Sequence, residues 1–259
     1  MANTVYANYV LEDKAKDLLL TAVNHRSLMT IDTSLAENAG MKKTIHTYQY
    51  NGKVETLGER EGNTTIGSLT YTSKDYDVLV LQQSADYTDE DVMKDPNTVD
   101  FAMKGATQTM ANQLTTDFYA ALAADENIGE TAGDFGYEHI VDAIANMNVE
   151  DESALFLIIN PEQKAAIRKD ADYKTAQLGE VVYNGMVGTI AGIPVISTKA
   201  VPAGVAYLLT KDAVHCFMKK DVEVEQERDA NTRVNKVFFR SAYVVAVVDA
   251  AKAQKLIAG

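Results

Sequence analysis

The stretch that decides the fold is Asp95–Ala124, DPNTVDFAMKGATQTMANQLTTDFYAALAA. Its apolar residues recur at intervals of three and four, the spacing of one helix face; they are Val99, Met103, Ala106, Met110, Leu114, Phe118, Ala121 and Leu122. Asp95 suits the N-cap, and Pro96 suits the first helical position because its missing N–H would be unpaired there. The pattern predicts one helix over residues 96–124, roughly 40 Å long, with one side buried beneath a sheet.

Strand-forming segments lie on both sides of this helix in the sequence. Residues 68–85 are rich in β-branched and aromatic side chains and predict one strong strand. Residues 222–228 alternate strictly between apolar and polar, and residues 237–248 are rich in apolar side chains. Two long strands cannot bury a face alone, so we expect both to join the 68–85 strand in a sheet that packs on the helix.

Between about residue 130 and residue 219, short helices and strands alternate. The expected elements are helices at 137–148 and 160–170 and strands at 154–159, 193–197, 205–210 and 214–218. Asn160 and Pro161 supply the cap and the first position of the second helix. This alternation predicts a compact α/β lobe inserted into a platform of sheet and helix.

The N-terminal part has few residues that could form a core. Residues 1–40 predict an arm with one short helix at 12–26. Residues 44–50 alternate β-formers with polar residues, and Asn51-Gly52 is a strong hairpin-turn signal, so residues 53–57 are expected to return as the second strand. An isolated hairpin is marginally stable in water, and we therefore expect a neighbouring copy to cover it.

Composition narrows the functional classes. The 259 residues carry a formal net charge of −13, and an acidic surface repels phosphate, which argues against a protein that reads nucleic acid. The one cysteine, Cys216, allows no intrachain disulfide and fits a reducing compartment. We see neither a signal peptide nor an apolar run long enough for a membrane span, so synthesis in the cytosol is expected.

No group of residues predicts catalysis. The four histidines, His25, His46, His139 and His215, lie outside the HExxH and Cys/His zinc spacings. His215 and Cys216 are adjacent on a strand and point to opposite faces, so Cys216 is expected in the core. Four carboxylates precede the long helix: Asp86, Asp89, Glu90 and Asp91. We expect them near a helix N-terminus rather than on a cation, and we predict no catalytic residue, cofactor or metal.

The order of the elements resembles the major capsid proteins of tailed phages with the Hong Kong 97-type fold, an α+β fold. Asn160-Pro161-Glu162 after an apolar strand is similar to a motif of that family's axial domain. The same holds for Gly188-x-x-x-Gly192-Ile193-Pro194-Val195-Ile196-Ser197, followed by Val201-Pro202-Ala203-Gly204. Residues 240–255 resemble the family's closing strand.

The resemblance implies a division of the chain into four parts. These are an N-terminal arm at 1–40, an extended β-hairpin loop at 41–68, a peripheral domain at 69–129 and 220–259 with a spine helix at 96–124, and an inserted axial domain at 130–219. Candidate inter-subunit contacts on the extended loop are Tyr48, Tyr50, Asn51, Gly52, Lys53, Val54 and Arg60. Some members join subunits through a lysine of this loop, but no acceptor matches here, and a solvated turn residue or a salt-bridge partner is the favoured interpretation of Lys53.

The resemblance also implies a structural protein, not an enzyme. Copies would assemble into hexamers and pentamers of an icosahedral shell around double-stranded DNA, without sequence-specific binding or a membrane. A portal is an expected partner. Because residues before 41 lack sustained heptads, assembly would need either a separate scaffolding protein or an earlier precursor that is processed to this chain. The expected location is the virion, and the host bacterial cytoplasm before assembly. Two alternatives stay open: an encapsulin-like nanocompartment shell protein, and a soluble enzyme with an unrecognised α/β site.

Overall fold

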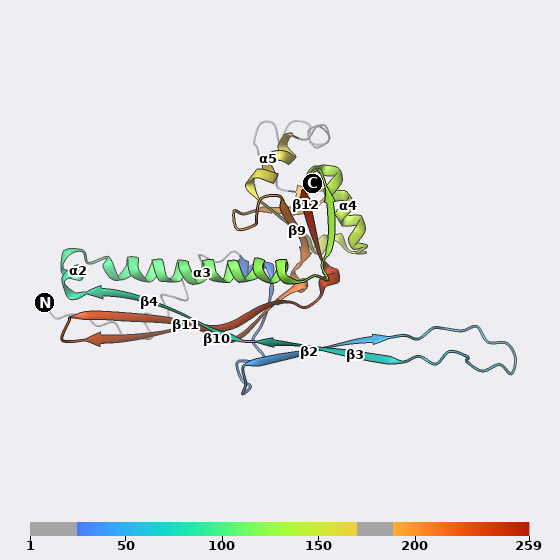
Figure 1. Ribbon diagram of the computed structural model, residues 1–259, viewed down its shortest axis with the longest axis horizontal. Coiled ribbons are helices and arrows are strands. Elements are labelled where there is room, and N and C mark those ends of the chain that lie inside the picture. Colours follow the sequence, from blue (N-terminus) through green and yellow to red (C-terminus); the bar gives the residue numbers. More distant parts are fainter. Residues whose placement is uncertain (1–24, 170–188, 259) are drawn as a thin grey trace.

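The computed structural model describes residues 25–169 and 189–258. The fold is α+β and has three parts (Figure 1). The platform is a four-stranded sheet with helices α2 and α3 along one face. The lobe is a six-stranded sheet with helices α4 and α5, and it stands at one end of the platform. The projecting hairpin is the strand pair β2–β3, which extends beyond the other two parts.

The platform sheet has the strand order β1-β10-β11-β4. Its strands are β1 (Thr30–Asp32), β4 (Leu79–Thr88), β10 (Val214–Asp229) and β11 (Val234–Val247). β11 pairs antiparallel with both β10 and β4, and β1 adds to β10 in parallel. The prediction that the two C-terminal strands join an earlier strand against the long helix is therefore confirmed.

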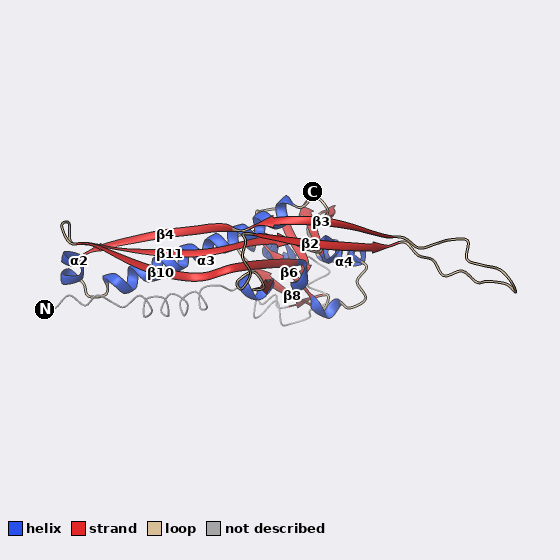
Figure 2. Cartoon of the chain, turned by 90° about the horizontal axis from the view of Figure 1, so that it is seen from below, coloured by secondary structure: helices blue, strands red, loops and turns tan. Residues whose placement is uncertain are grey.

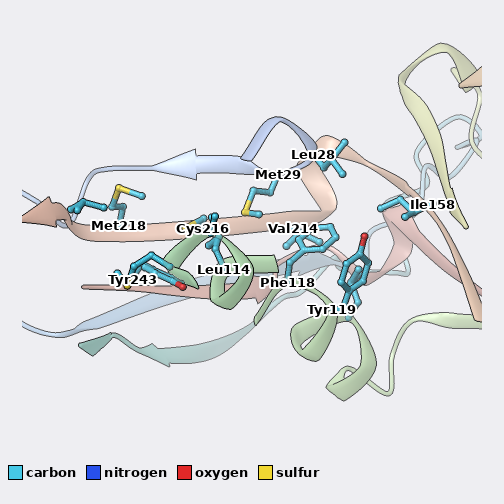
Figure 3. Packing of buried hydrophobic residues seen from close by; sticks show 14 of the residues in the cluster. Leu28, Met29, Leu114, Phe118, Tyr119, Ile158, Val214, Cys216, Met218 and Tyr243 are labelled. Carbon is cyan, nitrogen blue, oxygen red and sulfur yellow. The ribbon is translucent and has the colours of Figure 1, made fainter. Parts of the chain in front are cut away.

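Helix α3 (Thr98–Ala124) runs along the platform sheet (Figures 1 and 2). Phe118 is fully buried, Leu122 is 1% exposed and Met103 is 2% exposed, as the apolar stripe predicts. Figure 3 shows Leu114 and Phe118 of this helix among Cys216, Val214 and Tyr243 of the sheet. The sequence therefore identifies both the helix and its buried face correctly.

The predicted start of this helix is wrong by two residues. Asn97 is the N-cap of α3, whereas Asp95 is the C-cap of a separate short helix, α2 (Asp89–Lys94). The reason is a capping box at Thr88: the Asp91 N–H donates to Thr88 Oγ1 over 3.1 Å, and the Thr88 N–H donates to the Asp91 carboxylate over 3.2 Å. This box starts a helix earlier, and the Asp95–Asn97 segment becomes the link to α3.

The described part of the N-terminal arm packs on its own subunit. A 3-10 helix, η1 (His25–Leu28), leads into β1, and Met29 is fully buried. Figure 3 shows Leu28 and Met29 lying against the platform core near Val214. The expectation that residues 1–40 contain few core residues therefore needs correction at Leu28, Met29 and Leu35, which are buried because β1 pairs with β10. The helix expected at 12–26 falls almost wholly outside the described residues.

His25 ties this arm to α3. Its Nε2 lies 3.1 Å from the Tyr119 hydroxyl, and its Nδ1 lies 3.2 Å from Thr115 Oγ1. Burial lowers the pKa of His25 below its ordinary value. The unfolded chain therefore binds a proton at His25 more readily than the folded chain does. The folded state keeps the full stabilisation from neutral His25 above about pH 6.5 and loses it as the pH falls.

We expect this histidine to make the arm's attachment sensitive to pH. The melting temperature should fall between pH 7.5 and pH 5.5, and His25→Gln should flatten that profile because glutamine does not titrate. His46→Gln, which replaces an exposed histidine of the projecting hairpin, is the matched control. Calorimetry across the pH range measures this, and identical slopes for wild type and His25→Gln would contradict it.

The lobe sheet has the strand order β5-β12-β9-β6-β8-β7. Its strands are β5 (Gly129–Gly133), β6 (Leu155–Ile159), β7 (Thr189–Ile190), β8 (Ile193–Ser197), β9 (Val205–Thr210) and β12 (Ala253–Ala258). The lobe helices are α4 (Tyr137–Met147) and α5 (Pro161–Lys169), and short 3-10 turns occur at η2 (Glu152–Ala154), η3 (Lys211–Ala213) and η4 (Ala250–Lys252). These helices and the strands at 154–159, 193–197 and 205–210 match the sequence prediction.

Two strand assignments need correction. The strand predicted at 214–218 is not part of the lobe, because β10 continues from Val214 to Asp229 in the platform sheet with irregularities in register near Lys220. The chain end, expected with the platform, instead forms β12 between β5 and β9 of the lobe. Asp249 causes that turn: its carboxylate accepts the Ala251 N–H over 3.2 Å and caps η4, which redirects the chain after β11.

The two motifs quoted for the lobe meet in space. Asn160 Oδ1 accepts the Glu162 N–H over 3.0 Å and caps α5, while its Nδ2 donates to the Val201 carbonyl over 2.7 Å. Gly204 has φ +80° at the third position of the turn that follows, and Gly192 has φ +81° in the turn between β7 and β8. Both glycines therefore serve turns.

Candidate subunit interface

The projecting hairpin consists of β2 (Lys42–Tyr50) and β3 (Leu69–Asp77), paired antiparallel as a separate two-stranded sheet. Tyr50 lies opposite Leu69, and Tyr48 lies opposite Tyr71. The prediction that Asn51-Gly52 turns the chain and that residues 53–57 return as a strand is wrong. Pairing with β3 supplies a much longer ladder and aromatic cross-strand pairs, which outweigh the local turn signal.

The single strand predicted over 68–85 is two strands that break at Val78. This residue is 6% exposed, and its N–H donates to the Met41 carbonyl over 2.8 Å. Beside it, the Tyr76 ring stacks on Phe217 with centroids 5.8 Å apart, and the Tyr76 hydroxyl donates to the Val247 carbonyl over 2.9 Å. Val78 and Tyr76 therefore fix the root of the hairpin to the platform face opposite α3.

Beyond its root, the hairpin exposes large apolar and aromatic side chains. They are Tyr48, Tyr50, Val54, Leu57, Ile66, Leu69 and Tyr71. Val54 is fully exposed and Ile66 is 88% exposed. Figures 1 and 2 show the hairpin projecting past the platform and lobe, so no part of the described chain covers its far end. Apolar surface gathered on such a projection is typical of a contact with another molecule.

Each candidate contact residue lies on this hairpin or on its tip loop, residues 51–68. Tyr48 and Tyr50 belong to β2, and Asn51 continues the ladder by donating its N–H to the Ser68 carbonyl over 3.0 Å. Lys53 and Val54 are exposed, and Lys53 makes no ion pair or hydrogen bond with the described residues. Arg60 lies at the far turn with φ +69°, away from Lys53 in the sequence.

Sequence reasoning missed four exposed residues of the same surface. Leu57, Ile66, Leu69 and Tyr71 are absent from the candidate set. The predicted strand over residues 68–85 places Leu69 and Tyr71 in the platform sheet, where they would not be exposed. The signal that could have found them is the run Leu69-Thr70-Tyr71-Thr72, whose alternation with Tyr48 and Tyr50 in register predicts a partner strand for β2.

A second partly apolar surface lies beside the hairpin root. A groove of about 480 Å³ is lined by Ala36, Met41, Val80, Lys219, Lys220, Glu223, Arg240, Ser241 and Ala242. Val80 is 61% exposed on this face. Lys220 contacts Glu223 at 2.6 Å and Arg240 contacts Glu225 at 3.0 Å, while the Lys219 ammonium donates to the Leu35 and Asn38 carbonyls. The platform face opposite α3 thus offers an apolar strip at Val80 and Ala242 between charged residues.

The residues considered for catalysis have structural roles. Cys216 is 1% exposed, and burial raises the pKa of its thiol to about 11, so the thiol stays protonated and is no nucleophile. His215 lies beside the Phe217 ring, with centroids 5.8 Å apart, while Cys216 packs in the core beneath α3. The burial of Cys216 and its place beneath α3 confirm the prediction that this residue belongs to the core.

The acidic cluster is confirmed as carboxylates of a helix N-terminus. Asp89, Glu90 and Asp91 form the first turn of α2. Asp89 contacts Arg228 at 2.8 Å, and Glu90 contacts Arg233 at 2.7 Å. Within residues 25–169 and 189–258, no group of three or more His, Cys, Asp or Glu side chains could hold a metal ion. The described helices include none with the length and apolar character that a membrane crossing requires.

Comparison with known proteins places this geometry in a family. The family described as phage capsid protein matches residues 71–256. The major capsid protein of Staphylococcus phage phiMR11 is 26% identical over 240 residues, which cover 90% of this chain and 86% of that protein.

Solved structures share the fold at low sequence identity. The capsid of cyanophage P-SCSP1u aligns with a TM-score of 0.70 and 12% identity, covering 90% of this chain and 86% of that one. The capsid of the empty GTA particle gives a TM-score of 0.73 and 11% identity, covering 100% of this chain and 92% of that one. The virus-like particle from Pyrococcus furiosus gives 0.67 and 13%, covering 97% and 100%. The chain therefore belongs to the phage capsid protein family, and it is a major capsid protein of a tailed phage with the Hong Kong 97-type fold.

Proposed function

We propose that copies of this chain form the hexamers and pentamers of an icosahedral shell that encloses double-stranded DNA. The observation that carries this proposal is the projecting hairpin. It is anchored by buried contacts at its root, yet its far end exposes Tyr48, Val54 and Ile66 with no cover from its own subunit. In a closed shell every copy has a neighbour at the same place, and this neighbour would cover the exposed side chains of each hairpin.

The proposed partner surface of the hairpin is the platform of the adjacent copy. The strip beside the groove, with Val80 exposed, is the apolar surface that this arrangement would cover. In this proposal the chain divides into an arm at 1–40, an extended loop at 41–77, a peripheral domain at 78–128 and 214–252, and an axial domain at 129–213 and 253–259. Four boundaries differ from those expected from sequence, because β3 pairs with β2, β5 begins at Gly129, β10 begins at Val214 and β12 joins the lobe.

The charge balance supports DNA as the enclosed cargo rather than as a ligand. A net charge of −13 disfavours tight binding to phosphates, so packaged DNA can move during filling and release. We further propose a portal and a separate scaffolding protein as partners, the host bacterial cytoplasm as the site of assembly, and axial domains that meet around the symmetry axes.

Electron microscopy of particles formed by the full chain tests this function. We expect closed shells with five-fold and six-fold clusters and, from infected cells, DNA that resists added nuclease. Shells of uniform small size that contain protein cargo and no DNA would instead support a nanocompartment. A 28.3 kDa monomer at high concentration, measured by light scattering in the presence of the phage's other head proteins, would overturn the proposal.

A further inference from the structure

The tip loop has internal order that its composition does not predict. Residues 51–68 contain no helix or strand, and connections longer than ~12–15 residues without such elements are uncommon unless they have a function. No residue of this loop is fully buried, so an apolar core does not hold it together. Its two arms are nevertheless joined at successive levels between the end of the hairpin and the far turn.

The first level lies just beyond the paired strands. The Asn51 N–H donates to the Ser68 carbonyl, which adds one pair to the ladder. The Tyr50 ring then lies over Gly52 on one arm and Gly67 on the other, where a Cβ on either glycine would overlap the ring. The two glycines therefore form a seat for Tyr50, and this aromatic side chain bridges the arms.

The second level is a carboxylate clasp. Glu55 Oε2 accepts the Thr64 N–H over 2.8 Å, and Glu55 Oε1 accepts the Thr65 N–H and the Thr64 hydroxyl over 2.9 Å each. Hydrogen bonds to an ionised acceptor are stronger than those between neutral groups. They also lower the pKa of Glu55 to about 2, with the Thr65 and Thr64 hydrogen bonds as the main causes.

The third level is the far turn itself. The Glu61 N–H donates to the Gly58 carbonyl over 3.2 Å, and Glu61 Oε2 accepts the Gly58 N–H over 2.9 Å. Arg60 adopts φ +69°, a conformation that a non-glycine residue holds only where its surroundings determine it. The chain therefore reverses at Gly58–Glu61, and the clasp at Glu55 lies between this turn and the Tyr50 seat.

We propose that Glu55 is a positioning residue that fixes the shape of the tip loop before the loop docks on a second copy of this chain. The proposal rests on the proposed function of the hairpin as a contact between subunits. Val54 precedes the clasp residue on one arm, and Ile66 follows Thr65 on the other, so the clasp sets the spacing of the two most exposed apolar side chains of the loop. Holding them in place before docking removes an entropic cost of binding.

The lowered pKa of Glu55 agrees with this role across the physiological range. A carboxyl group with a depressed pKa in the folded state contributes its stabilisation above its ordinary pKa. The contribution is lost as the pH falls through the folded value of about 2. The clasp is therefore complete from neutral pH down to about pH 5.

Glu55→Gln in the full chain tests the proposal, because it removes the charge and leaves one acceptor oxygen. The matched control is Glu59→Gln, which removes the same charge from the same loop, at a residue without a hydrogen bond to any described residue. The rate of amide hydrogen exchange at Thr64 and Thr65 in unassembled subunits measures whether the clasp is closed. The yield of shells as a function of subunit concentration, followed by light scattering, measures how well the loop docks.

We expect Glu55→Gln to speed exchange at the Thr64 and Thr65 amides by roughly tenfold and to raise the concentration needed for shells several-fold. Glu59→Gln should match wild type in both measurements. Thr64→Val, which removes only the hydroxyl donor, should have a smaller effect, and combined with Glu55→Gln it should add little because both changes break one network.

Three results would overturn the proposal. One is fast exchange at Thr64 and Thr65 in the wild-type subunit, which would show that no clasp exists. Another is normal shell formation by Glu55→Gln despite faster exchange, which would remove the positioning role while the shell function stands. The third is an equal loss of shells in Glu59→Gln, which would assign the effect to charge alone. Failure of the wild-type chain to form any shell would instead count against the proposed function.

Discussion

Leu114→Asp is expected to prevent folding of the chain. Leu114 is 5% exposed and lies on the face of α3 that packs against the platform sheet (Figure 3). The change removes a buried apolar side chain, at a cost of about 2–5 kcal/mol, and places a carboxylate in an apolar core where the neighbouring Arg26 already contacts Asp221, which costs several kcal/mol more. The total is comparable with the whole stability of a typical domain, about 5–15 kcal/mol.

Asn112→Asp is the matched control for this prediction. It introduces the same charge two residues away on the exposed face of α3, where the side-chain oxygen already accepts a hydrogen bond from Gln108 over 3.1 Å. Circular dichroism and limited proteolysis of soluble protein report the outcome. A folded, protease-resistant Leu114→Asp subunit beside a normal Asn112→Asp subunit would show that the buried face of α3 is assigned wrongly.

Replacing the tip loop with a short turn is expected to abolish shell formation without unfolding the subunit. Tyr50 and Leu69 are opposite each other in the ladder, so the two residues Asn-Gly can join them directly in place of residues 51–68. The hydrogen bonds that the structure gives for these residues stay within the hairpin. Removing residues 51–68 should therefore shift the melting temperature by no more than about 2 °C, since a change of ~1 kcal/mol in the free energy of unfolding shifts the melting temperature of a domain of this size by ~2–4 °C.

Sedimentation and electron microscopy measure the effect of this replacement on assembly. We expect subunits or small oligomers and at least a tenfold lower yield of shells, because Val54, Leu57 and Ile66 are lost together. The Glu59→Gln variant, which keeps the loop, serves as the control for expression and purification. Shells in normal yield from the shortened chain would show that the hairpin tip makes no essential contact between subunits.

The sequence predicted the elements whose evidence is local. The apolar stripe of α3 is complete within one segment, so Phe118 and Leu122 could be placed in the core without knowledge of the rest of the chain. The Asn160 cap of α5 is equally local. The start of α3 was predicted two residues early because two start signals lie close together: the Thr88 capping box begins α2, and Asp95, although its carboxylate accepts the Asn97 N–H over 2.9 Å, lies in the link between the two helices.

Pairings between distant segments could not be predicted in the same way. Asn51-Gly52 is a genuine turn signal, but the ladder between β2 and β3 places it inside the tip loop. β12 enters the lobe because the chain changes direction at Asp249. The cap at Asp249 indicates a turn, but it does not indicate which sheet the following strand joins. In the candidate interface, Val54 was found because the whole segment 41–68 was expected to project as a hairpin, although residues 53–57 were expected to be a strand. Tyr71 was missed because its exposure follows from its partner strand.

The contact between the tip loop and a neighbouring subunit is tested most directly by a cryo-electron microscopy map of shells assembled from the full chain. We expect Val54 and Ile66 of each tip loop to lie against the platform of an adjacent copy, with the Glu55 clasp to Thr64 and Thr65 intact. A map in which the tip loops project into solvent and contact no other copy would contradict this expectation.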